Sequence, residues 1–135
     1  MKIFIAVKAP RGDKGREDLA SLVAEQVKEA GLEPFLAYRE IERRGMSDPR
    51  LFMPFVRQHM REAGLAIILY DSELRGGLIE EGMAYACEVP IWLLALAGER
   101  ASSSALGCAD RVIEYTSADD LAKQLGAALD SLLKG

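Results

Sequence analysis

The feature that most constrains the fold is a series of short, continuous apolar runs separated by segments with helical periodicity. The first run, Ile3 to Val7, and the clearest one, Leu65 to Tyr70, show no alternation of apolar and polar side chains. A strand of this kind is buried on both faces, as in a parallel sheet that helices cover on both sides. The alternation of such strands with helices therefore predicts an α/β fold.

Five strands and four helices are expected. The other strands are Pro34 to Tyr38, Pro90 to Leu96 and Arg111 to Tyr115. The helices are one closed by Gly31, one that starts at Asp48-Pro49 and is kinked or restarted at Pro54, Leu78 to Cys87, and one capped by Ser117. The segments predicted as loops are Arg39 to Ser47, Asp71 to Gly77 and Gly98 to Gly107.

This element order places a binding site. Right-handed crossovers favour a flavodoxin-like three-layer sandwich with strand order 2-1-3-4-5, formed by one domain over residues 1–135. In that order the first and third strands lie side by side, and ligands bind outside their carboxyl ends. The loops Lys8 to Gly15 and Asp71 to Gly77 are therefore expected to form a small-molecule site.

Composition argues against several classes of partner. The net charge is −4 and the basic residues are scattered, whereas a long nucleic acid needs a basic stripe. Cys87 and Cys108 form no CxxC pair and His59 is the only histidine, so neither a zinc site nor a cofactor is expected. Two isolated cysteines fit a cytoplasmic protein in which they are small core residues. No apolar run approaches the ~20 residues of a membrane span.

The two loops offer positive charge and backbone N–H groups. Arg11, Gly12 and Arg16 belong to the first loop, which matches neither a P-loop nor a GxGxxG fingerprint and could equally be a solvated loop. Gly76 and Gly77 are placed where a helix begins, which is an anion site in principle.

Other polar residues have an ordinary alternative role. Glu80 is expected in the first turn of its helix, where Glu81 would serve equally as a favourable carboxylate. His59 shares a helical face with aromatic residues and is expected to pack or to form a hydrogen bond. Ser102, Ser103 and Ser104 are either loop residues or contacts for a phosphate.

At the second loop the sequence resembles the nucleoside 2-deoxyribosyltransferase family, above all its 2′-deoxynucleoside 5′-phosphate N-hydrolases and CMP-type hydrolases. The family pattern is an apolar strand that ends in an acid, followed by G-x-x-x-E-x-G-x-A. Here the strand is Ile67 to Asp71 and the motif is Gly76 to Ala84. Val89-Pro90-Ile91 resembles the entry to the next strand, and Arg11 to Asp18 resembles the R-G-G-R-E-D of the hydrolases.

The resemblance implies an N-glycosidase of nucleosides or nucleoside 5′-monophosphates. Glu80 would be a nucleophile, kept ionised by the helix dipole, that attacks C1′ of the sugar. Asp71 would bind a sugar hydroxyl or orient Glu80. The residues expected to bind substrate are Lys8, Arg11, Gly12, Arg16, Gly76, Gly77, Ser102, Ser103 and Ser104. A homodimer is implied, in which a loop of one subunit completes the other's site.

The chain also departs from the family pattern. Arg57 and Leu65 stand where the family has aspartates, and Leu74 stands where a serine is common. Arg11, Arg57 or Arg75 could bind phosphate instead. A transferase, or a nucleotide-binding domain without catalysis, therefore stays open as an alternative. Large apolar groups at Leu51 to Met53 and at Trp92 favour a dimer.

Overall fold

The computed structural model describes residues 1–135 and contains one five-stranded parallel sheet in the order β2-β1-β3-β4-β5. The strands are β1 (Lys2–Ala6), β2 (Glu33–Leu36), β3 (Ala63–Leu69), β4 (Ile91–Leu96) and β5 (Arg111–Tyr115). The helices are α1 (Lys14–Glu29), α2 (Ala37–Arg43), α3 (Pro49–Glu62), α4 (Gly76–Ala86), α5 (Ser103–Cys108) and α6 (Ala118–Lys134). The α/β class and the strand order predicted from the sequence are confirmed.

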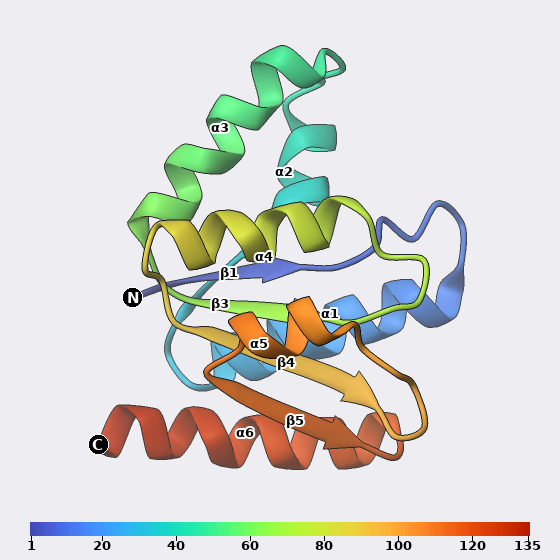
Figure 1. The fold of residues 1–135 in the computed structure, drawn as a ribbon, viewed down its shortest axis with the longest axis vertical. Helices are drawn as coiled ribbons and strands as arrows, with labels where there is room; N and C mark the ends of the chain where they lie inside the picture. Colours follow the sequence, from blue (N-terminus) through green and yellow to red (C-terminus); the bar gives the residue numbers. More distant parts are fainter.

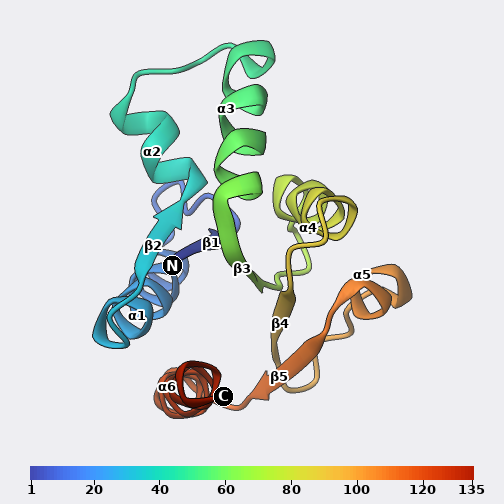
Figure 2. The ribbon, with the colours of Figure 1, turned by 90° about the vertical axis from the view of Figure 1, so that its left-hand side faces the viewer.

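Helices cover the sheet on both faces (Figures 1 and 2). Helices α1 and α6 pack on one face, while α3, α4 and α5 pack on the other. Ile3 and Ile5 of β1 point to the first face, and Phe4 and Ala6 point to the second. All four side chains are buried, which explains why the sequence shows an unbroken apolar run here.

Two of the predicted helix starts, those of α3 and α6, are confirmed by hydrogen bonds of the capping side chains. Asp48 accepts a hydrogen bond from the backbone N–H of Arg50, and Pro49 is the first residue of α3. Ser117 accepts from the N–H of Asp120 at 3.1 Å at the start of α6. The third helix begins at Pro49 and continues through Pro54, so the proline interrupts the hydrogen bonding without starting a new helix.

Two predicted loops contain helices instead. The segment predicted as a loop from Arg39 begins inside α2, which also takes the last residues of the expected second strand. Arg39 holds α2 on α1, because its Nη2 donates to Glu17 at 2.6 Å and to Ser21 at 2.7 Å. Helix α5 lies in the loop predicted from Gly98 to Gly107, and Ser102 caps it.

Two predictions about single side chains are wrong. Cys87 is exposed rather than a core residue, because it follows the last residue of α4 on the surface. Trp92 is buried in the sheet and gives no support to a dimer. His59, in contrast, packs as expected: its ring stacks on Phe35 at 4.1 Å, and its Nδ1 lies 2.7 Å from the ammonium of Lys2.

None of the helices combines the length and apolar character that a membrane crossing requires.

Candidate active site

A cavity of about 460 Å³ opens at the carboxyl end of β1, between that end and the start of α4. This is the edge of the sheet at which β1 and β3 lie side by side, where the strand order predicts a ligand. Glu80 of α4 and Lys8, just after β1, both line it. Five of the predicted site residues line this cavity, namely Lys8, Arg11, Gly76, Gly77 and Glu80.

Glu80 does not lie in the first turn of its helix. Helix α4 begins at Gly76, two residues earlier than predicted, so Glu80 falls in the second turn. Burial raises the pKa of the Glu80 carboxyl to about 8, and no hydrogen bond to another side chain offsets this. The expectation that the helix start keeps Glu80 ionised is therefore wrong for the unliganded protein, in which desolvation has the larger effect.

Glu81 occupies a different environment from that of Glu80. Its side chain is only 2 % exposed, on the face of α4 that packs toward the sheet with Gly77 and Ala84. Its Oε2 has no hydrogen-bond partner, and burial raises its pKa to about 7. Glu81 does not line the Glu80 cavity, so the two carboxylates are not interchangeable.

Three cationic side chains line the same cavity as Glu80. They are Lys8, Arg11 and Arg75, and none of them forms an ion pair with a carboxylate. Arg11 has a φ of 46° and Gly12 a φ of 88°, so this turn needs the left-handed conformation that glycine adopts most easily. The cavity therefore combines a half-buried carboxyl with unpaired positive charge.

An apolar wall of the cavity comes from elements that the sequence did not associate with the site. Tyr38 and Ile41 belong to α2, and Phe52 belongs to α3. The Tyr38 hydroxyl is fixed, because it donates to Glu17 at 3.1 Å and accepts from Arg39 Nε at 3.0 Å. With α2 predicted as a loop, no pattern in the sequence pointed to Tyr38 or Ile41.

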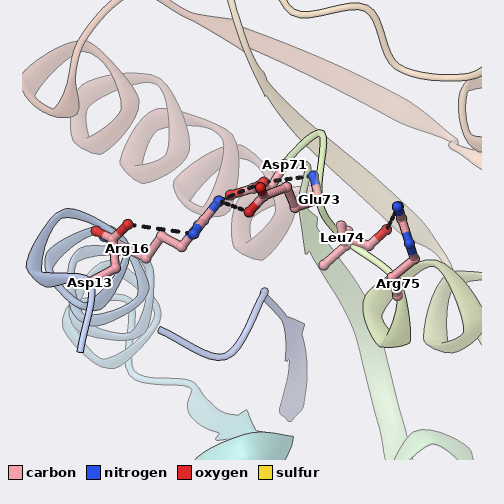
Figure 3. Close-up of polar contacts among 6 residues, drawn as sticks. All are labelled: Asp13, Arg16, Asp71, Glu73, Leu74 and Arg75. Carbon is pink, nitrogen blue, oxygen red and sulfur yellow. Dashed lines mark hydrogen bonds and ion pairs between the residues drawn. The ribbon is translucent and has the colours of Figure 1, made fainter. Parts of the chain in front are cut away.

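Arg16 and Asp71 bind each other (Figure 3). Arg16 Nε donates to Asp71 Oδ2 at 2.7 Å, and Nη2 donates to Asp71 Oδ1 at 3.1 Å and to Glu73 Oε2 at 2.9 Å. The Arg16 guanidinium lowers the pKa of Asp71 through these hydrogen bonds. Arg16 and Asp71 line a smaller cavity of about 130 Å³, which shares Val7 and Lys8 with the Glu80 cavity, and Asp71 forms no hydrogen bond with Glu80.

The remaining predicted site residues divide into two groups. Gly76 and Gly77 line the Glu80 cavity, as expected. Ser102, Ser103 and Ser104 are exposed and do not line it. Ser102 instead accepts the N–H of Ala105 at 3.2 Å, which explains its place before α5.

Of the positions that depart from the family pattern, Leu74 lines the Glu80 cavity, whereas Arg57 and Leu65 do not. Arg57 is exposed on α3 and does not line the Glu80 cavity, whereas Arg75 does. Leu65 is buried in β3. No group of three or more His, Cys, Asp and Glu side chains is arranged to hold a metal ion.

Gly77 is expected to be required at the cavity edge. A Cβ at this position would lie 2.5 Å from Leu74 Cδ1 and 2.9 Å from its Cγ, so the buried Leu74 side chain would have to shift from its packed position. Gly77→Ala should therefore destabilise the protein by about 1–3 kcal/mol in urea unfolding. Gly76→Ala is the matched control, since its Cβ meets nothing within 4 Å. Equal stability of the two variants would contradict the prediction.

No protein-family model matches the chain, and no curated protein does. Solved structures do match. The chain is similar to the CMP N-glycosidase BcmB of Clostridium botulinum, with 17% identity, a TM-score of 0.71, and 93% of this chain and 98% of that chain covered. It is also similar to a 2-deoxyribosyltransferase from Bacillus psychrosaccharolyticus, with 14% identity, a TM-score of 0.73, and 96% of each chain covered.

A third similar structure is that of BlsM, with 18% identity and a TM-score of 0.74, over 98% of this chain and 91% of that chain. The similarity in each case extends over nearly the whole of both chains. The chain therefore has the fold that a CMP N-glycosidase and a 2-deoxyribosyltransferase share, as the resemblance at Gly76 to Ala84 implied.

Proposed function

We propose that the protein is an N-glycosidase that cleaves the bond between base and sugar in a nucleoside 5′-monophosphate. The observation that carries the proposal is the Glu80 cavity, in which one half-buried carboxyl, three unpaired cations and an aromatic wall come together. The names of two proteins with the same fold, a CMP N-glycosidase and a 2-deoxyribosyltransferase, support it.

Glu80 is the nucleophile in this proposal. An oxygen of its ionised carboxylate attacks C1′ of the sugar, and the electron pair of the C1′–N bond leaves with the base, which takes up a proton from solvent. Water then attacks C1′ of the glycosyl ester, releases the Glu80 carboxylate and gives up a proton. The products are the free base and a sugar 5-phosphate, with configuration retained at C1′ after two displacements.

The other groups of the cavity suit the two ends of a nucleotide. Lys8, Arg11 and Arg75 supply charge for the phosphate, and charge-assisted hydrogen bonds are roughly twice as strong as neutral ones. Tyr38 and Phe52 supply aromatic surface for the base. Burial alone raises the pKa of Glu80 in the unliganded protein, so ionisation of Glu80 at neutral pH needs that pKa to fall.

The direct test is a panel of nucleosides and nucleoside monophosphates, with free base measured by chromatography. The proposal expects equal amounts of base and sugar phosphate from at least one monophosphate. Base exchange in the presence of a second base, faster than hydrolysis, would favour a transferase.

A nucleotide-binding domain without catalysis is the second candidate. It is favoured by Arg57 and Leu65 at the positions of family aspartates, and by a pKa of about 8 that leaves Glu80 mostly protonated at neutral pH in the unliganded protein. Binding of a monophosphate in calorimetry, with no base released from any member of the panel between pH 6 and 9, would establish this candidate and reject the enzyme.

A monophosphate should be preferred over its nucleoside, because Arg11 lines the cavity without a carboxylate partner. Arg11→Ala should lower kcat/KM for the monophosphate by about 10- to 100-fold, the equivalent of losing ~1.5–3 kcal/mol of one charged hydrogen bond, and leave the nucleoside little changed. Lys14→Ala is the matched control in the same loop, since Lys14 pairs with Asp18 and lies outside the Glu80 cavity. Equal losses for both substrates would reject a phosphate site at Arg11.

A homodimer stays a prediction. Exposed apolar side chains on α3 and α4 support it, since Leu51 is 65 % exposed and Ile79 and Tyr85 are each 61 % exposed. A partner subunit would also be the means by which the exposed Ser102 to Ser104 segment reaches a substrate, because it does not reach the cavity of its own chain.

A further inference from the structure

We propose that Arg16 is a positioning residue, which fixes the loop between β3 and α4 and through it the start of the helix that carries Glu80. This inference rests on the proposed function for its effect on activity. It replaces the expectation, drawn from the sequence, that Arg16 binds the substrate. The loop in question runs from Tyr70 to Arg75, and Gly76 begins α4 directly after it.

Arg16 makes short contacts with this loop through Nε and Nη2 of its guanidinium group. Two nitrogens meet both oxygens of Asp71, and Nη2 also meets Glu73 (Figure 3). Asp71 Oδ1 accepts in addition the backbone N–H of Glu73 at 2.9 Å, and the Asp71 carbonyl accepts the N–H of Leu74 at 2.8 Å. Arg16 therefore holds the residue around which the loop folds.

The other end of Arg16 is itself fixed. Asp13 caps α1, and its Oδ1 accepts the backbone N–H of Arg16 at 3.1 Å. The remaining nitrogen, Nη1, lies 3.5 Å from Asp13 Oδ2. Arg16 thus ties the first turn of α1 to the loop after β3, across the carboxyl end of β1.

Charge makes Arg16 a poor phosphate ligand. If Arg16 turned to a phosphate, it would leave the carboxylates of Asp71 and Glu73 without their cation beside an anionic substrate. Removing one partner from a partly buried ion pair is costly, because the other charge is left uncompensated. Arg11 and Arg75 line the Glu80 cavity without such partners, so they can bind a phosphate without breaking an ion pair.

The kinetic test compares a nucleoside with its monophosphate in three variants: Arg16→Met, Asp71→Asn and the double variant. Because Arg16 acts through the loop, Arg16→Met should lower kcat/KM by about 10- to 100-fold equally for both substrates. The double variant should be no worse than the worse single variant, since both changes break the same contact. A loss confined to the monophosphate, or effects that multiply in the double variant, would overturn the proposal.

Two further variants separate charge and general stability from positioning. Arg16→Lys keeps the charge but lacks the planar fork that meets both carboxylate oxygens, so it should restore less than half of the lost activity on a logarithmic scale. Full restoration would overturn the proposal. Arg43→Met removes an ion pair of 2.6 Å with Glu40 on α2 and is the matched control, expected to be active.

Hydrogen exchange tests the inference without activity. The amides of Glu73 and Leu74 donate to Asp71, so in Arg16→Met they should exchange at least about tenfold faster than in the wild type, and in Arg43→Met they should not change. Unchanged exchange in Arg16→Met would overturn the positioning role. If the wild type releases no base, the proposed function fails, while the exchange result still decides the role of Arg16.

Discussion

Replacing Glu80 with glutamine should reduce base release by about a thousandfold or more, because the amide has the shape of the carboxyl but cannot attack C1′. Glu81→Gln is the matched control on the next residue and should keep activity within a few-fold, since Glu81 does not line the cavity. The measurement is kcat/KM for the best monophosphate by chromatography of the free base. The reverse order of effects would assign the nucleophile to Glu81.

The same carboxyl predicts the pH dependence of the wild type. Burial raises the pKa of Glu80 to about 8. Below pH 8, the ionised fraction of Glu80 therefore grows about tenfold for each unit by which the pH rises. A nucleophile needs the ionised form, and kcat/KM should therefore rise from pH 6, reach half of its maximum near pH 8 and level off above that pH. If Glu80 were a general acid, kcat/KM would instead fall as pH rises through 8, and the nucleophile would have to be sought elsewhere.

Glu81→Gln should stabilise the protein at alkaline pH. Burial raises the folded pKa of Glu81 to about 7 from an ordinary value of 4.5, so the folded state holds a proton that the unfolded state has already lost. Stability should thus fall as pH rises from about 4.5 through about 7. At pH 8 the wild type has lost the whole stability contribution of the protonated Glu81 carboxyl. The variant should then be more stable than the wild type by about 1–3 kcal/mol in urea unfolding.

The pH range over which wild type and Glu81→Gln differ in stability tests this prediction. At pH 4.5 and below, wild type and Glu81→Gln should have nearly equal stability, because the carboxyl is protonated in both states of the wild type. Glu29→Gln, a change at an exposed position of α1, is the control and should give no difference that grows with pH. A Glu81→Gln difference that stays constant from pH 4.5 to 8 would show that Glu81 is not a buried, unpaired acid.

The strands, and the presence of a cavity at the carboxyl end of β1, could be predicted because their signals are local. The unbroken run at Ile3 to Val7 and the cap at Ser117 act through neighbours in the sequence, and the strand order follows from few allowed crossovers. Helix α2 could not be predicted in this way. It has only one fully buried residue, Ala37, and it is held by Arg39 on α1, a contact between segments far apart in the sequence.

The protonation of Glu80 and the ion pair of Arg16 could not be predicted from the sequence either. The motif identifies Glu80 by its spacing from the loop glycine. Spacing does not show that α4 begins at Gly76, two residues earlier than predicted, or that burial raises the pKa of Glu80. Arg16 is visible in the sequence as a cation in a loop. That it is already neutralised by Asp71 depends on the folding of β3 beside β1, which brings the two loops together.

Under the proposed function, substrate range and bond cleavage would depend on separate parts of this chain. The aromatic wall comes from α2 and α3, which form one excursion between β2 and β3 beyond the edge of the sheet, whereas Glu80 stands on α4 (Figure 1). The excursion is still anchored to the inner strands, because Val56 and Met60 of α3 are buried in the core with Phe4 of β1. Under the proposed function, exchange of the cavity-lining residues Tyr38, Ile41 and Phe52, with Val56 and Met60 kept, should change base preference while Glu80 stays in place.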